Sequence, residues 1–407
     1  MHFRHILSAL ARHRMAVCLL VLEIAFSCAV ICNALFLISA RLERMRRPTG
    51  VDEAHLVQVR VRSIAPGSAG SIMAQTHTDL AALRAVPDVT HVSIVNQTLF
   101  GHSFSASGVS LSDAPKAPSI TVTQYYGNAQ LPGTLGLKLV DGRWFKPDEF
   151  VSDEQMEGAG GTVPVIITRA LARHFFPSQQ AVGKVIYAFG TNRIVGVVDR
   201  LVQPRDSGSA EAYEYAMLFP VNLSYAQGTY LLRVRDASQR AAVIHAALHA
   251  LKTDGPLRLV SPKDATTLEA ARAKYYRNDR AMAWLLVGVC VSLLAVTAVG
   301  IVGLTSFWVA QRRRQIGIRR AIGATRGDIL RYFQVENFLI ATFGIALGMV
   351  LAYGINLLLM RHYELGRLPG YYLPIGALAL WLLGQLAVLG PALRAAAVPP
   401  VVATRSV

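Results

Sequence analysis

The hydrophobic residues of the chain fall mainly into four long stretches with almost no charge. Residues 15–39 contain one ionisable carboxylate, Glu23, and residues 281–311, 337–360 and 368–393 contain no Asp, Glu, Lys or Arg. A helix needs about 20 apolar residues to cross a bilayer, and each stretch meets that length. The pattern predicts four membrane-spanning helices, with a separate domain between the first and the second.

The first apolar stretch also has features of a signal peptide, because basic residues precede it. It is longer than the 7 to 15 apolar residues typical of a signal peptide. It ends in Leu-Ile-Ser-Ala followed by Arg41. We expect a retained membrane anchor.

The domain between the first two spans shows patterns of both strands and helices. Val57, Val59 and Val61 alternate with polar residues, as in a half-buried strand. Helix signals include Thr168 as an N-cap. We expect an α+β domain of two lobes, with strands at 55–62, 120–125, 164–167, 193–198 and 229–235, helices at 78–86, 168–176 and 239–251, and loops at 67–71, 157–161 and 206–209.

The predicted fold class is an α-helical membrane protein with four transmembrane helices plus a large α+β extracytoplasmic domain between helices 1 and 2. The expected limits are a cytoplasmic tail at 1–14, transmembrane helix 1 at 15–40, the extracytoplasmic domain at 41–275, a stalk with helix 2 at 276–310, a cytoplasmic loop at 311–328, helix 3 at 329–360, a short outer loop at 361–372, helix 4 at 373–393 and a cytoplasmic tail at 394–407.

Composition and charge agree with a membrane protein. The chain is 53% hydrophobic and 16% charged, against roughly 25% charged residues in an ordinary soluble protein. The net charge of +16 would suggest nucleic-acid binding. However, the basic surplus borders the apolar stretches, where Lys and Arg set membrane orientation, so we expect no nucleic-acid partner.

The short loops predict the orientation. Residues 311–331 hold seven arginines, and both tails are basic. Basic residues in short loops favour the cytoplasmic side, so both termini and this loop are expected to be cytoplasmic. Four arginines that follow the first span directly disagree, but long domains cross the membrane largely regardless of charge.

Catalytic and metal-binding patterns are weak. His245 and His249 have the i, i+4 spacing of two metal ligands, but no acidic residue accompanies them as in H-E-x-x-H. Gly183-Lys184 lacks the other residues of a phosphate loop. The four cysteines all lie in the apolar stretches, so the outer domain can form no disulfide. We expect no catalytic residue, no metal and no cofactor in this chain.

The arginine-rich loop is the most informative segment. In RRRQIGIRRAIGATRGD, arginines alternate with small apolar residues, so a short helix would have a basic side and an apolar ridge. Such a helix suits docking into a groove on a soluble partner. The alternative is a basic anchor at anionic lipid headgroups.

This loop resembles the segment between the second and third spans of the FtsX/MacB-type permeases of ABC transporters. The resemblance also covers the order of one span, a large outer domain and three spans. Further similar pieces are LGLKLVDGRWFKPDEF, VPVIITRALARHFFPSQQAVGKVI, IVGVVDRL and PALRAAAVPPVVATR. Residues 311–400 fall in the FtsX-like region, and the outer domain is similar to a MacB-like periplasmic core domain.

Resemblance to this family implies a division of labour. A separate ABC ATP-binding subunit would hydrolyse ATP with Mg, and two permease chains, as a homo- or heterodimer, would convert its motion into movement of the outer domains in the bacterial inner membrane. A periplasmic adaptor is a possible further partner. The chain would therefore be no enzyme itself, and transport would proceed by mechanotransmission without a polar pore.

By the same resemblance, the cytoplasmic loop forms the helix that docks on the ATPase. One position departs from the family pattern, because the family usually has a glutamate where this chain has Gln315. A helical pattern without proline runs from Thr267 to Arg314, which predicts one continuous rod. The implied coupling residues are Arg312, Arg313, Arg314, Ile316, Gly317, Ile318, Arg319, Arg320, Ala321, Gly323 and Ala324.

Two carboxylates and two glycines within the spans are further candidates. Glu23 and Glu336 are ionisable groups inside the membrane, which are functional candidates by default, with a neutral structural role as the alternative. Gly344 and Gly348 form a G-x-x-x-G suited to close helix packing within the chain or across a dimer.

The function implied is the permease subunit of an ABC exporter. One alternative is an FtsX-like relay that activates a cell-wall hydrolase, and a further one is a lipoprotein-extracting permease. The sequence does not specify the substrate.

Overall fold

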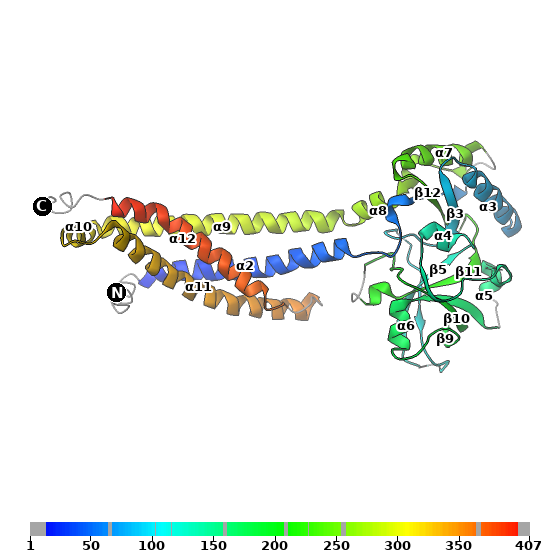
Figure 1. The fold of residues 1–407 in the computed structure, drawn as a ribbon, viewed down its shortest axis with the longest axis horizontal. Helices are drawn as coiled ribbons and strands as arrows, with labels where there is room; N and C mark the ends of the chain where they lie inside the picture. The colour runs from blue at the N-terminus through cyan, green and yellow to red at the C-terminus, as the bar shows by residue number, and fades with distance from the viewer. Residues whose placement is uncertain are drawn as a thin grey trace. The chain divides into compact units, whose positions relative to one another are not determined.

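The computed structural model of the protein describes residues 14–63, 67–101, 103–114, 116–157, 161–206, 211–226, 228–253, 258–363 and 368–397. The chain forms two compact units, residues 1–46 with 278–407, and residues 47–277 (Figure 1). Most of the two expected tails and part of the loop at 361–372 lie outside the described residues.

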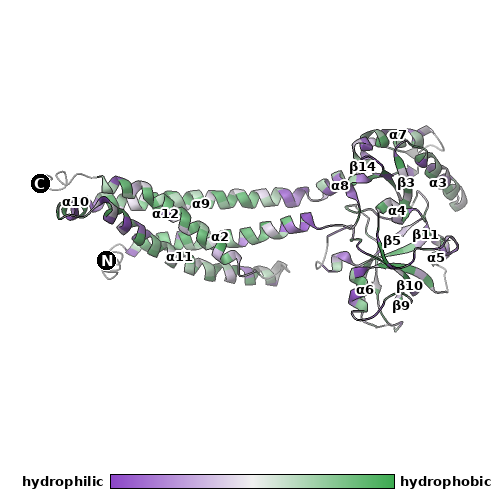
Figure 2. Cartoon of the chain, viewed as in Figure 1, coloured by the Kyte–Doolittle hydropathy of each residue, from purple (hydrophilic) through white to green (hydrophobic). Residues whose placement is uncertain are grey.

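The first unit is helical. Its long helices are α2 (Arg14–Arg46), α9 (Arg277–Gln311), α11 (Arg326–Tyr363) and α12 (Tyr372–Ala396), and a short helix, α10 (Arg313–Ala321), lies between α9 and α11 in the chain. All four long helices are long and apolar enough to cross a membrane. Figure 2 shows hydrophobic residues along most of their length. The prediction of four spans is confirmed at this level.

The first helix is longer than the apolar stretch that predicted it. It continues to Arg46, and Arg41 forms an ion pair with Asp279 of α9. Hydroxyls of Ser27 and Thr297 also join α2 and α9, with 2.9 Å between their oxygens. The ion pair of Arg41 lies beyond the apolar stretch, in the added part of the helix.

Two glycines allow α11 to pack closely on α2. A Cβ atom at Gly344 would lie 2.8 Å from Cβ of Ile24, and one at Gly348 would lie 2.5 Å from Cβ of Cys28. Small residues let helix backbones approach in this way. Of the two alternatives for this G-x-x-x-G, the structure places it within the chain, against α2.

The prediction of one continuous rod from Thr267 to Arg314 is wrong. Helix α8 (Leu268–Tyr275) ends at Tyr276, where φ is −87° and ψ is 12°. A second interruption occurs at Arg312, where φ is −99° and ψ is 11°. Absence of proline removes one obstacle to a long helix, but a helix can also be interrupted at residues other than proline.

The second unit is an α+β domain, as predicted. Within the described residues, twelve strands form one mixed sheet with the main order β14-β1-β12-β3-β5-β11-β8-β10-β6, and β4, β7 and β9 pair with β5, β11 and β10. The bounds are β1 (Leu56–Val59), β3 (Val89–Val95), β4 (Ala106–Val109), β5 (Ile120–Gly127), β6 (Leu139–Gly142), β7 (Val151–Ser152), β8 (Val163–Thr168), β9 (Val185–Ala188), β10 (Gly190–Val198), β11 (Ala216–Asn222), β12 (Thr229–Val234) and β14 (Ala265–Thr267). A separate pair joins β2 (Arg62–Ser63) to β13 (Arg258–Leu259).

Helices cover this sheet. They are α3 (Ala69–Arg84), α4 (Leu131–Leu135), α5 (Asp153–Glu157), α6 (Arg169–Phe175), α7 (Arg240–Thr253) and α8, and short 3-10 turns are η1 (Glu53–His55), η2 (Pro147–Glu149), η3 (Ala212–Glu214), η4 (Ala237–Gln239) and η5 (Pro262–Asp264). Helices α3 and α7 lie near β3 and β12, and α6 lies near β9 and β10 (Figure 1). The apolar core lies between these helices and the sheet.

The expected strands and helices of this domain are largely confirmed, with two corrections. The stretch expected as a loop at 67–71 contains the start of α3, because Ser68 caps the helix by accepting a hydrogen bond from the Ser71 amide at 3.3 Å. The two expected lobes share one sheet. Its two groups of strands meet at β3 and β5, which pair only through Val95 and Gly127.

Replacing Gly348 with Ala tests the packing of α11 on α2. Overpacking costs about 1 to 3 kcal/mol, so we expect Gly348→Ala to lower the thermal midpoint of the purified chain in detergent. Gly354→Ala is the matched control on the same helix, since no atom lies within 4 Å of a Cβ there and Ala favours the helix. Equal midpoints for both variants would contradict this packing.

Candidate functional site

The arginine-rich segment folds as a helix between two turns. Helix α10 follows the break at Arg312 and ends at Ile322, and Gly323 then adopts a φ of +105°, a conformation that favours glycine. The start of α11 is capped by a reciprocal pair, in which Asp328 accepts from the Thr325 amide at 3.0 Å and Thr325 accepts from the Asp328 amide at 3.2 Å. These two turns set the direction of α10 within the helical unit.

Helix α10 has one buried side and one exposed side. Ile316 and Gly317 are buried, and Ile316 belongs to the core of the helical unit. The exposed side presents Arg313 and Arg314 beside two isoleucines, Ile318 at 44% and Ile322 at 82% exposure. Large apolar side chains exposed beside cations suit contact with another surface.

Arg312 does not belong to the exposed side. Its Nη1 lies 3.2 Å from Oε1 of Glu336 on α11, and the two side chains are only 14% and 2% exposed. The same guanidinium lies over the ring of Trp308 at 5.9 Å and donates to the Tyr332 hydroxyl at 3.4 Å. The structure therefore turns this predicted docking arginine inward, and Glu336 gains a basic partner that is distant in sequence.

Two further predicted residues hold α10 in place. Arg320 donates from Nη1 to the carbonyl oxygen of Ala396 at 2.9 Å, which satisfies a group at the carboxyl end of α12. The guanidinium of Arg319 lies 5.2 Å from the ring centre of Tyr332 on α11. A cation over an aromatic ring is attracted to its π face. Helix α10 is thus tied by side chains to both α11 and α12.

The remaining predicted residues lie at the surface of the turn. Ala321 and Gly323 are exposed and Ala324 is half-buried. Gln315, the position that departs from the family pattern, is exposed and lines a cavity of about 160 Å³ together with Arg312, Arg319 and Tyr332.

Glu23 lies apart from this site, on the face of α2 that meets α9. A Cβ atom at Gly300 would lie 2.7 Å from its Oε2, so the missing side chain of Gly300 leaves room for the carboxylate. Its Oε1 has no hydrogen-bond partner among the residues that the structure describes. Its role stays a prediction.

Two family models match the chain and together cover most of it. The MacB-like periplasmic core domain matches residues 20–273, and the FtsX-like permease C-terminal region matches residues 287–400. The chain belongs to the FtsX/MacB-type permease family.

Curated relatives of this permease include two macrolide export ATP-binding/permease proteins MacB. The protein from Chromobacterium violaceum is 28% identical over 280 residues, which is 65% of this chain and 40% of that protein. The protein from Bordetella avium is 24% identical over 372 residues, 88% of this chain and 52% of that protein. The permease chain thus spans about half or less of the length of these relatives.

A solved structure of the periplasmic region of MacB from Actinobacillus actinomycetemcomitans is also similar to the permease. It is 14% identical, with a TM-score of 0.34, and the match covers 58% of this chain and 97% of that chain.

Sequence reasoning missed the inward contacts of this site. Trp308 and Arg312 are four residues apart, as are Tyr332 and Glu336, so each pair shares a helix face. That spacing was available from the sequence. The fact that the two faces meet is shown only by the tertiary contacts of Arg312 with Glu336 and Tyr332.

Replacing Glu336 with Gln tests the ion pair. Loss of one partner of a buried pair costs about 3 kcal/mol, so we expect a clear drop in the stability of the permease in detergent. The double variant Arg312→Met with Glu336→Leu should recover most of it, because neither charge is then left unpaired. Glu43→Gln, on an exposed part of α2, is the control and should be neutral.

Thermal unfolding of the purified chain measures all three. A Glu336→Gln variant as stable as the Glu43→Gln control would contradict a buried pair, as would a double variant no better than the single one.

Proposed function

We propose that the chain is the permease subunit of an ABC transporter that transmits ATP-driven motion to its outer domain. The observation that supports this most is the exposed side of α10. Helix α10 has a basic and apolar exposed surface. Its other side is held to the membrane helices by the ion pair of Arg312 with Glu336 and by the hydrogen bond of Arg320 to the Ala396 carbonyl oxygen. Movement imposed on such a helix passes to α11 and α12.

The partner in this proposal is an ABC ATP-binding subunit, which binds ATP and Mg and hydrolyses ATP. The names of the curated relatives join an ATP-binding function to a permease function, which agrees with such a partnership. The exposed contact residues are Arg313, Arg314, Ile318 and Ile322, with Gly323 and Ala321 at the end of the helix. In this proposal Arg312 positions α10 and does not touch the ATPase.

The permease is a protein of the inner membrane, and we place α10 on its cytoplasmic side. Seven arginines in residues 311–331 favour that side. Both termini then lie in the cytoplasm, and the α+β domain lies outside.

Mechanotransmission needs no polar route through the spans. Two of the buried polar residues of the helices show this: Ser27 bonds to Thr297, and Asn33 donates to the carbonyl oxygens of Ala29 and Ala352 at 3.0 Å. Groups satisfied in this way are not free to line a water-filled path. These bonds support export by movement of the outer domain rather than through the spans.

A second permease chain completes the proposal. In the most apolar window of α9, 17% of the residues are buried within the chain, against 44% in α2. The uncovered face of α9 is therefore available to lipid or to another chain.

Reversing two exposed arginines tests the docking surface. We expect Arg313→Glu with Arg314→Glu to abolish co-purification of the ATPase subunit, because two attractive charges become repulsive at the contact. The matched control is Arg326→Glu with Arg394→Glu, two exposed arginines outside α10. Both variants should insert in the membrane. Full co-purification of the first pair, or equal loss with the control pair, would argue against this surface.

Cysteine labelling tests the orientation. In a chain whose four cysteines are replaced by serine, Ala321→Cys should react with a membrane-impermeant maleimide only after the cytoplasmic membrane is opened. Lys184→Cys in the α+β domain should react in intact spheroplasts. Reaction of Ala321→Cys in intact spheroplasts would place α10 outside and overturn the proposal.

A further inference from the structure

Two points of the chain join the α+β domain to the membrane helices. Helix α2 ends at Arg46 and α9 begins at Arg277, so the chain enters the domain just after Arg46 and leaves it just before Arg277. We call the residues next to these two points the entering and the leaving segment. The two segments lie side by side within the domain, because Nη2 of Arg272 on α8 donates to the carbonyl oxygen of Arg47 at 2.8 Å.

Ion pairs bind the entering and leaving segments together. Nη1 of Arg272 lies 2.6 Å from Oε1 of Glu53, and the Thr49 hydroxyl donates to the same oxygen at 2.6 Å. Arg47 pairs with Asp206 at 3.1 Å, and the Asp206 side chain is 2% exposed. Breaking a pair that is this well buried leaves a charge without compensation.

Aromatic rings fill the space beside these charges. The Phe100 ring lies 5.5 Å from the Arg272 guanidinium and 5.7 and 5.9 Å from the rings of Tyr275 and Tyr276. Phe100 has a φ of +61°, an uncommon conformation for a side chain of this size. Strained backbone of this kind persists only where its surroundings hold it, and such positions cluster at functional sites.

Tyr276, where the helix is interrupted between α8 and α9, contacts these same residues. Tyr276, where the helix breaks, donates from its hydroxyl to Asp206 at 3.4 Å, and the Asp206 amide donates to the Tyr275 hydroxyl at 3.0 Å. Burial raises the pKa of Tyr276 to about 12, so its hydroxyl stays a neutral donor beside the carboxylate. We call the whole group the junction cluster, and it comprises Arg47, Glu53, Phe100, Asp206, Arg272, Tyr275 and Tyr276.

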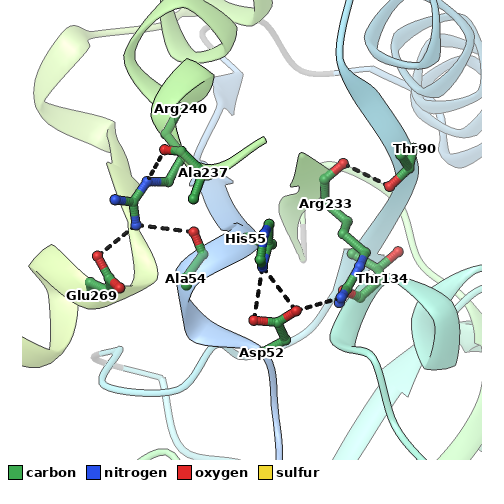
Figure 3. A network of polar contacts seen from close by, with 9 residues as sticks. All are labelled: Asp52, Ala54, His55, Thr90, Thr134, Arg233, Ala237, Arg240 and Glu269. Atoms are coloured by element: carbon green, nitrogen blue, oxygen red, sulfur yellow. Dashed lines mark hydrogen bonds and ion pairs between the residues drawn. The ribbon is translucent and has the colours of Figure 1, made fainter. Parts of the chain in front are cut away.

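A second network connects the junction cluster to the sheet. Asp52, next to Glu53, pairs with Arg233 of β12 at 2.6 Å and with His55 (Figure 3). Arg240 of α7 pairs with Glu269 of α8 at 2.6 Å and donates to the carbonyl oxygen of Ala54. The two consecutive carboxylates Asp52 and Glu53 thus face different partners, one in the sheet and one on the leaving helix.

We propose that the junction cluster transmits displacement of the membrane helices to the outer domain, with Arg272 and Glu53 as its positioning residues. The inference deepens the proposed function and rests on it. A continuous helix would pass force along its own backbone, but the helix is interrupted at Tyr276. Side-chain contacts of the junction cluster join the entering and leaving segments to each other. In this proposal a displacement of α2 and α9 therefore moves the whole domain.

The test measures the position of the domain during the nucleotide cycle. Spin labels are attached at Glu43→Cys on α2 and Lys184→Cys in the domain, in a chain with its native cysteines replaced. The labelled chain is diluted into unlabelled permease, assembled with the ATPase subunit and reconstituted in nanodiscs. Pulsed electron resonance then gives the distance distribution without nucleotide and with ATP trapped by vanadate.

In the otherwise unchanged chain, we expect a distribution that shifts with nucleotide. Arg272→Ala and the milder Glu53→Gln should broaden it and abolish the shift, while ATP hydrolysis and assembly with the ATPase continue. Arg143→Ala is the matched control, because it removes another ion pair of the same domain, with Glu149, outside the junction cluster. That control should keep the shift.

The outcomes separate this inference from the proposed function. If the unchanged chain does not assemble with the ATPase or shows no nucleotide-dependent shift, the proposed function fails. If that shift exists but survives in Arg272→Ala and Glu53→Gln, or is lost equally in Arg143→Ala, the junction cluster does not transmit it. Where Arg272→Ala does not fold, Glu53→Gln alone decides.

Discussion

The buried ion pair between Arg312 and Glu336 determines how the arginine-rich segment sits on the helical unit. Two charges with side-chain exposures of 14% and 2% are stable in an apolar bundle only when each compensates the other. Their pairing fixes the end of α9 against α11, and α10 follows directly from that point. The exposed side of α10 is therefore a consequence of an interaction made on its inner side.

The same principle applies to Ser27 and Asn33, two other buried polar residues of the helices. A buried hydroxyl or amide loses its water and must find a partner within the protein. Ser27 finds Thr297, and Asn33 finds two backbone carbonyl oxygens. At Gly344 and Gly348 there is no side chain, so the backbones of α2 and α11 approach closely. Packing and internal hydrogen bonds together hold the helical unit.

The α+β domain uses comparable interactions at its two connections. Arg47, Glu53, Asp206 and Arg272 pair in a region where Phe100 adopts a strained backbone. Helix α8 stops at Tyr276, so the domain is held to its connections by side chains as well as by the chain itself. In the mechanism that we propose, such contacts matter as much as the helices, because a flexible connection would absorb displacement.

The sequence by itself determined the four spans, the α+β class of the intervening domain and the family. Long runs without charge need no knowledge of packing, because the bilayer imposes the same requirement on every spanning helix. Alternating valines and an N-cap threonine are likewise local signals, and they located β1 and α6 correctly. Only the tertiary structure decided that Arg312 points inward, that Gly344 and Gly348 face α2, and that the expected rod is broken at Tyr276 and Arg312. The first two depend on residues distant in sequence that come within a few ångströms only when the elements pack, and local patterns hold no information on that proximity.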